Sequence, residues 1–177
     1  YSSLRNAFFD SAERDAITHV HTTNNLISQY LADYSRIAEV LSSLPEIQGA
    51  LENPQTDTLR QANNILDHFQ KGAHVNVCYL MDRTGVTIAS SNRFAADSFV
   101  GKDYSFRPYF QNAMSGRKAV YLALGVTSGK RGFYFSHPVY GSDSGIPVGT
   151  AVVKGSAEGI VKRLLRKTGA AHRLQKA

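Results

Sequence analysis

A helical pattern of about 40 residues opens the chain and constrains its architecture more than any other feature. From about Ser3 to Leu44, apolar residues recur at three- and four-residue steps, as they do along one face of an amphipathic helix. Pro45 interrupts the pattern, and Pro54 falls in a second break. A helix of this length spans ~60 Å, which is too long for an isolated small domain. We therefore expect residues 1–56 to form a helical stalk, a dimerisation segment, or both.

After a second helical segment, at 57–71, the apolar period changes from 3.6 to 2. A DRTG turn within residues 75–91 predicts a β-hairpin, and a short helix is expected from about Arg107 to Ser115. Three further strands are predicted at 119–127, 133–140 and 148–154. This order of elements predicts an α+β fold in which a five-stranded antiparallel sheet follows a long N-terminal helix.

The formal charge of +6 is concentrated at the C-terminal end. From Lys154 to Ala177 there are seven Lys or Arg and one Glu, whereas basic and acidic residues balance in the rest of the chain. This tail has no aromatic residue, so binding of nucleic acid through it is an alternative that the composition does not favour. The one cysteine, Cys78, lies in an apolar run, as a structural thiol does.

Arg107 is the first candidate binding residue, because it lies in the segment DYSFRPYF at the start of the short predicted helix. A guanidinium group matches a carboxylate with two parallel hydrogen bonds. Tyr104 and Tyr109 can add hydroxyl donors nearby. The alternative, which composition leaves equally open, is an exposed loop arginine beside packed tyrosines.

The predicted strand 119–127 has two different faces. One face is mostly small and the other is apolar, and we expect the apolar set to lie in the core: Tyr121, Ala123, Gly125 and Thr127 against Val120, Leu122, Leu124 and Val126. The small residues leave space against the sheet, and Thr127 and Ser128 place two hydroxyl groups beside it. A plain hairpin turn is the alternative.

Lys154 ends an apolar strand, where an ammonium group needs an acidic partner or an open end that leads to water. A ligand carboxylate can supply that partner. With Arg107, this lysine can hold both ends of a short dicarboxylate, and a monocarboxylate would leave one cation unpaired.

Enzymatic motifs are not found in the sequence. The six histidines form no HExxH-like pair, and neither a G-x-S-x-G elbow nor a phosphate-binding glycine loop occurs. We therefore predict no catalytic residues, no metal and no cofactor for this chain.

Four blocks in order carry a family resemblance: YLMDRTGVTIASSN, SFVGKDYSFRPYFQNAMSG, ALGVTSGKRGFYFSHPV and GTAVVK. Together they resemble the periplasmic double-Cache (PAS-like) sensor domain of bacterial C4-dicarboxylate sensor histidine kinases. The resemblance implies that Tyr104 and Arg107 bind one carboxylate, that Thr127 and Ser128 hydrogen-bond the ligand, and that Lys154 pairs with a carboxylate. It also implies further residues of the pocket wall, namely Tyr109, Arg131 and Tyr134.

The same resemblance implies a periplasmic domain of an inner-membrane protein that binds succinate, fumarate or malate and forms a homodimer through the N-terminal helix. Residues 57–155 would be the membrane-distal PAS-like unit. Residues 156–177, a basic tail of doubtful structure, depart from the family pattern, so we expect the second PAS-like unit to be missing. Similar sensor domains in diguanylate cyclases and chemoreceptors, which bind other small carboxylates, are the alternative.

Overall fold

The computed structural model describes residues 2–127, 129–142 and 145–167, and these residues form two compact units. One unit runs from Asp33 to Gly159 and holds the sheet, the helices packed on it and the end of the first helix. The other contains helical residues 2–32 and 160–167. The first unit thus begins within the predicted stalk, before residue 57.

Three helices precede the sheet; the apolar pattern predicts the first and the third of them, but not the short helix between them. They are α1 (Ser2–Ser42), α2 (Pro45–Glu52) and α3 (Thr56–Gly72). Pro45 occupies the first turn of α2, where its missing N–H costs no hydrogen bond, and Leu44 before it is extended. The proline therefore separates two helices instead of kinking one.

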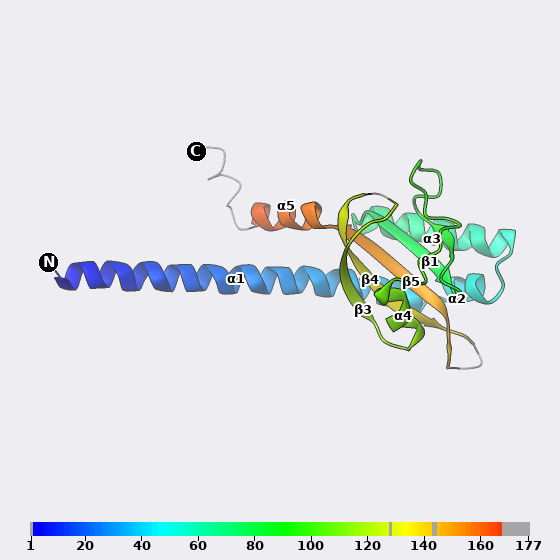
Figure 1. Ribbon diagram of the computed structural model, residues 1–177, viewed down its shortest axis with the longest axis horizontal. Helices are drawn as coiled ribbons and strands as arrows, with labels where there is room; N and C mark the ends of the chain where they lie inside the picture. Colours follow the sequence, from blue (N-terminus) through cyan, green and yellow to red (C-terminus); the bar gives the residue numbers. More distant parts are fainter. Residues whose placement is uncertain (1, 128, 143–144, 168–177) are drawn as a thin grey trace. The chain divides into compact units, whose positions relative to one another are not determined.

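The predicted five-stranded antiparallel sheet is confirmed, and Figure 1 shows it. Its strand order is β2-β1-β5-β4-β3. The strands are β1 (Val77–Asp82), β2 (Thr87–Ser90), β3 (Ala119–Leu124), β4 (Arg131–Tyr140) and β5 (Pro147–Ser156). β5 is the central strand and pairs with β1 on one side and with β4 on the other. Side chains from the C-terminal part of the chain therefore lie between side chains from its middle part.

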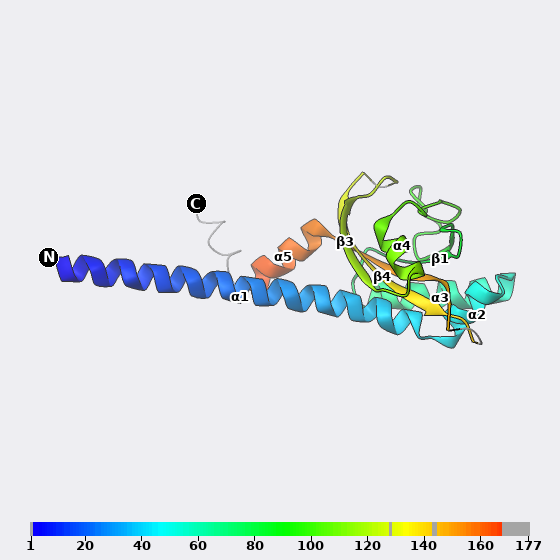
Figure 2. The same cartoon turned by 60° about the horizontal axis from the view of Figure 1, so that its bottom comes forward.

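Helices cover the two faces of the sheet differently. α2, α3 and the last turns of α1 lie on one face, and α4 (Pro108–Met114) lies on the other (Figure 2). On the first face the ring of Tyr34 stacks on Phe135, with 5.4 Å between ring centroids, and Leu41 and Leu80 are fully buried. Burial of this apolar surface fixes the end of α1 on the sheet.

The prediction that the apolar face of strand 119–127 lies in the core is wrong. Exposed fractions rise along that face from 47% to 64%, in the order Val120, Leu122, Leu124 and Val126. The reason is that β3 is an edge strand, and the helices on this side pack on the strands β1, β2, β4 and β5. The face with small residues is the one that turns inward. There Tyr121 and Ala123 pack against a buried cluster that includes Tyr79, Tyr109 and Tyr134.

A fifth helix, α5 (Ala157–Lys167), directly follows β5. It occupies the beginning of the segment for which the sequence predicted no definite structure. Within the described ranges, no helix is long and apolar enough to cross a membrane.

Candidate ligand-binding site

The loop before α4 is held in place by the turn of the β1–β2 hairpin. The N–H group of Tyr104 donates to the carbonyl of Gly85 at 2.9 Å, and the N–H group of Arg107 donates to the carbonyl of Tyr104 at 2.9 Å. Gly85 has a φ of +91°, and a Cβ atom there would lie 2.6 Å from the Cα atom of Ser105. Only glycine allows this close approach, so the hairpin turn positions the loop that carries Tyr104 and Arg107.

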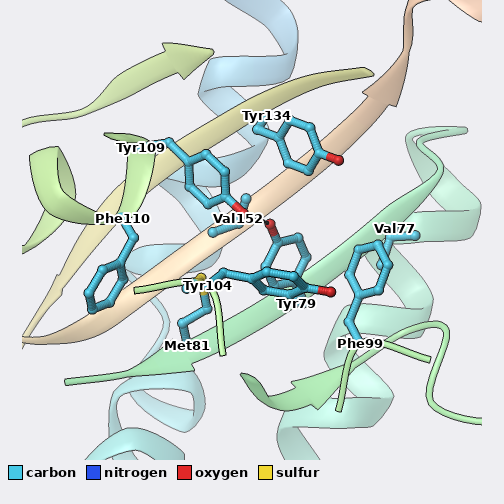
Figure 3. Packing of buried hydrophobic residues seen from close by; sticks show 9 residues of the cluster. All are labelled: Val77, Tyr79, Met81, Phe99, Tyr104, Tyr109, Phe110, Tyr134 and Val152. Carbon is cyan, nitrogen blue, oxygen red and sulfur yellow. Dashed lines mark hydrogen bonds between the residues drawn. The ribbon is translucent and has the colours of Figure 1, made fainter. Parts of the chain in front are cut away.

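Five aromatic residues enclose a first cavity on the α4 face of the sheet: Tyr79, Phe99, Tyr104, Tyr109 and Tyr134. The rings of Tyr109 and Tyr134 stack at 5.1 Å, and the hydroxyl groups of Tyr79 and Tyr109 are 2.8 Å apart (Figure 3). The cavity has a volume of about 10 Å³, enough for about one water molecule. Any molecule much larger than water would therefore enter only if these walls moved.

Burial raises the pKa of each of the four cavity tyrosines, and the shift is largest at the two most enclosed hydroxyl groups, Tyr79 and Tyr109. These hydroxyls are protonated at neutral pH, as tyrosine ordinarily is, and the raised pKa opposes their ionisation further. They can then donate hydrogen bonds to a carboxylate oxygen without adding a negative charge.

The polar groups at the mouth of this cavity bond to one another. The hydroxyl oxygens of Tyr104 and Thr127 are 2.6 Å apart, and a terminal nitrogen of Arg107 donates to the carbonyl of Leu124 at 3.0 Å. Arg107 occupies the N-cap position of α4 without a capping hydrogen bond from its side chain, and it is half-buried. A carboxylate that bound here would replace these internal hydrogen bonds with stronger, charge-assisted ones.

Lys154 lies on β5, facing the same side of the sheet, with only 5% of its surface exposed. Its ammonium nitrogen lies 5.3 Å from the ring centroid of Phe99 and 5.5 Å from that of Tyr134. Gly132 on the neighbouring strand leaves room for its stem, because a Cβ atom there would lie 3.1 Å from the lysine Cε atom. Burial lowers the pKa of Lys154, so an anion that binds beside it would relieve part of the desolvation cost. The side chain is therefore mostly covered, and it lines a cavity instead of extending over the outer surface.

A second, larger cavity adjoins the first at Phe99, which lines both. Its volume is about 230 Å³. Cations and polar side chains dominate its lining: Asn76, Asn92, Asp97, Lys130, Arg131, Lys154 and Ser156, together with Val77 and Phe99. Phe99 thus belongs to the walls of both cavities, with Arg107 lining the first and Lys154 the second.

No model of a protein family matches the chain, but individual relatives do. The C4-dicarboxylate transport sensor protein DctB of Pseudomonas aeruginosa is 37% identical over 131 residues, which is 73% of this chain and 21% of the relative. The protein of the same name from Rhizobium meliloti is 39% identical over 121 residues, covering 68% of this chain and 19% of the relative.

A solved structure is also similar to this chain. The sensor domain of the V. cholerae histidine kinase DctB is 32% identical, with a TM-score of 0.77 over 83% of this chain and 57% of that one. The chain belongs to the DctB family of sensor domains. It spans about a fifth of the length of its curated relatives.

In this DctB-type domain, the sequence-predicted site residues gather at the two cavities. The first cavity is lined by Tyr104, Arg107, Tyr109, Thr127 and Tyr134, and the second by Arg131 and Lys154. Ser128 lies outside the described residues. Arg131 is exposed at the rim, whereas the others are buried or half-buried.

Sequence reasoning did not identify several residues that line the cavities, among them Tyr79, Phe99 and Asp97. Tyr79 lies on the inward-facing side of the first hairpin strand, so the alternation there could have pointed to it. Phe99 and Asp97 come from the irregular loop after β2, which has no periodicity to read. Among the described residues, no group of three or more His, Cys, Asp or Glu side chains gathers in a way that could hold a metal ion.

Proposed function

We propose that this domain binds a C4-dicarboxylate such as succinate, fumarate or malate in the two adjoining cavities. The names of the relatives support the ligand class, and the walls supply the chemistry. The observation that carries the proposal is the placement of two cations, Arg107 and Lys154, at cavities that share the ring of Phe99. A dianion can pair with both cations, whereas a monocarboxylate such as acetate can pair with only one of them.

Ligand binding would require a change of state in the domain. The second cavity, at about 230 Å³, admits a small ligand, while the first, at about 10 Å³, does not. One carboxylate would enter beside Lys154, and the other would reach Arg107 only after the Tyr104–Thr127 hydrogen bond opens. A ligand that binds the open state more tightly shifts the population toward it, which is sufficient for sensing.

The parent protein is, on this proposal, a histidine kinase anchored in the bacterial inner membrane, with this domain on the periplasmic side. Relatives named as sensor proteins and as a histidine kinase support that assignment. We also propose that α1 mediates a homodimer. Ile17 and Val20, with exposed fractions of 50% and 60%, offer apolar surface on α1 for such a contact.

Thermal unfolding with and without ligand tests the binding proposal. At ~100 times its dissociation constant, a ligand adds about 2.7 kcal/mol to the free energy of unfolding. For a chain of this size that raises the melting temperature by roughly 5–10 °C. We expect the rise with C4-dicarboxylates and not with acetate.

Arg107→Ala should abolish the shift, whereas the control Arg117→Ala should retain it. Arg117 is exposed on the segment after α4 and lines neither cavity. Undiminished ligand affinity in Arg107→Ala would refute the proposed site.

A further inference from the structure

One acidic side chain, Asp97, lies among the cations of the second cavity. The other charged side chains that line this cavity within the described part of the chain are Lys130, Arg131 and Lys154. Burial lowers the pKa of Lys154, and the negative charge of Asp97 is the largest influence that opposes this. Asp97 also adds to the rise that burial causes in the pKa of Tyr104. The carboxylate therefore acts on groups of both cavities.

The loop that carries Asp97 is held by a set of hydrogen bonds to Asn92. The Nδ2 group of Asn92 donates to the carbonyl of Asp97 at 3.0 Å, and its Oδ1 atom accepts from the N–H group of Phe99 at 3.2 Å. The hydroxyl of Ser90 also donates to that Oδ1 atom, at 2.6 Å. Asp97 and the shared wall residue Phe99 are thus positioned by one side chain that is itself anchored at the end of β2.

Two amide side chains of this cavity wall, Asn92 and Asn76, make hydrogen bonds elsewhere. Asn92 bonds to the backbone of Asp97 and Phe99. The Oδ1 atom of Asn76 accepts a hydrogen bond from the N–H group of Ser156 at 2.6 Å. Within the described residues, the Asp97 side chain makes no hydrogen bond and no ion pair. An ionised carboxylate accepts hydrogen bonds and donates none. It repels the carboxylates of a bound dianion unless the ligand brings a donor to it.

We propose that Asp97 selects ligands that carry a hydrogen-bond donor on the carbon next to a carboxylate, that is, 2-hydroxy- or 2-amino-C4-dicarboxylates. This inference rests on the proposed function and narrows its ligand class. The two carboxylates of the ligand pair with Arg107 and Lys154, and the hydroxyl or ammonium group donates to Asp97. Succinate and fumarate, which lack the donor, leave Asp97 facing a carboxylate.

Calorimetric titration of the 177-residue chain with L-malate, L-aspartate and succinate tests this selection. Wild-type protein should bind L-malate or L-aspartate about tenfold or more tightly than succinate, as one charge-assisted hydrogen bond provides. Asp97→Asn should lower the affinity for L-aspartate about tenfold and the affinity for L-malate about threefold, because an amide still accepts a hydrogen bond but carries no charge. Succinate should bind equally well or more tightly, because one repulsive charge is removed.

Asp15→Asn is the matched control, since Asp15 is exposed on α1 and lines neither cavity. It changes the net charge equally and should leave all three affinities unchanged. Ligand preference that is the same in Asp97→Asn and wild type would overturn this inference alone. If wild type binds none of the three acids, the proposed function fails as well.

Discussion

The close contact between Gly85 and Ser105 links the stability of the domain to the geometry of its binding site. Gly85→Ala has two costs. At a φ of +91° any side chain is strained, and the new Cβ atom would lie 2.6 Å from both the Cα and the Cβ atoms of Ser105. The strain of a left-handed residue costs about 1–2 kcal/mol, and overpacking against backbone costs about 1–3 kcal/mol more. We expect a loss of about 3–4 kcal/mol in the free energy of unfolding.

Gly101→Ala separates the backbone strain from the overpacking. Gly101 has a φ of +78°, but no atom lies within 4 Å of the position of a Cβ atom there. Only the strain of about 1–2 kcal/mol should apply there. Measured by urea denaturation, Gly85→Ala should lose at least 1 kcal/mol more than Gly101→Ala, and it should also bind dicarboxylates more weakly because Tyr104 and Arg107 move with Ser105. Equal losses in the two variants would refute the argument that the hairpin turn positions this loop.

Three further changes have defined outcomes. Lys154→Met should abolish the thermal shift with C4-dicarboxylates, because it removes the buried cation that would pair with a ligand carboxylate; a retained shift would contradict this. Burial lowers the pKa of His137, opposed by Glu39 and assisted by Lys118, so the unfolded state takes up more protons. Stability should fall as pH drops below the ordinary histidine pKa of about 6.5, and His137→Leu should reduce that slope in pH-dependent denaturation. Leu122→Ser should change stability by less than about 0.5 kcal/mol, whereas a core position would lose several times more.

The parts of the fold that produce a periodic pattern of apolar residues could be predicted from the sequence. The long helix, the proline break and all five strands follow from spacing that the backbone itself imposes. The error at β3 shows the limit of that argument. Alternation divides a strand into two faces, but it does not say which face meets a partner layer, and an edge strand can leave its apolar face uncovered.

The candidate site likewise contains some residues that the sequence indicates and others that only the folded chain brings together. Arg107 and Tyr104 could be found because a cation and hydroxyl groups stand together at a helix start. For Lys154 the sequence left two possibilities open, and its burial beside Phe99 and Tyr134 depends on strands that meet only in the folded sheet. Asp97 could not be found, since it comes from a loop whose path is fixed by the side chain of Asn92.

β4 offers a direct connection from the cavity to the stalk helix, and this gives a final prediction. Tyr134 faces the first cavity, and the next residue, Phe135, packs on the opposite face of the sheet against Tyr34 of α1. A ligand that moves Tyr134 must therefore displace or stiffen the strand on which α1 rests, because a packed core does not absorb such shifts.

Hydrogen-exchange mass spectrometry of the 177-residue chain measures this connection. Ligand should slow amide exchange at 33–42, the part of α1 that belongs to the sheet unit, as well as around the cavities. Tyr34→Leu keeps an apolar side chain but removes the ring stack of 5.4 Å, so it should reduce the slowing at 33–42 while leaving it unchanged around the cavities. Protection confined to the cavity walls in the wild-type chain would show that β4 does not carry the signal to α1.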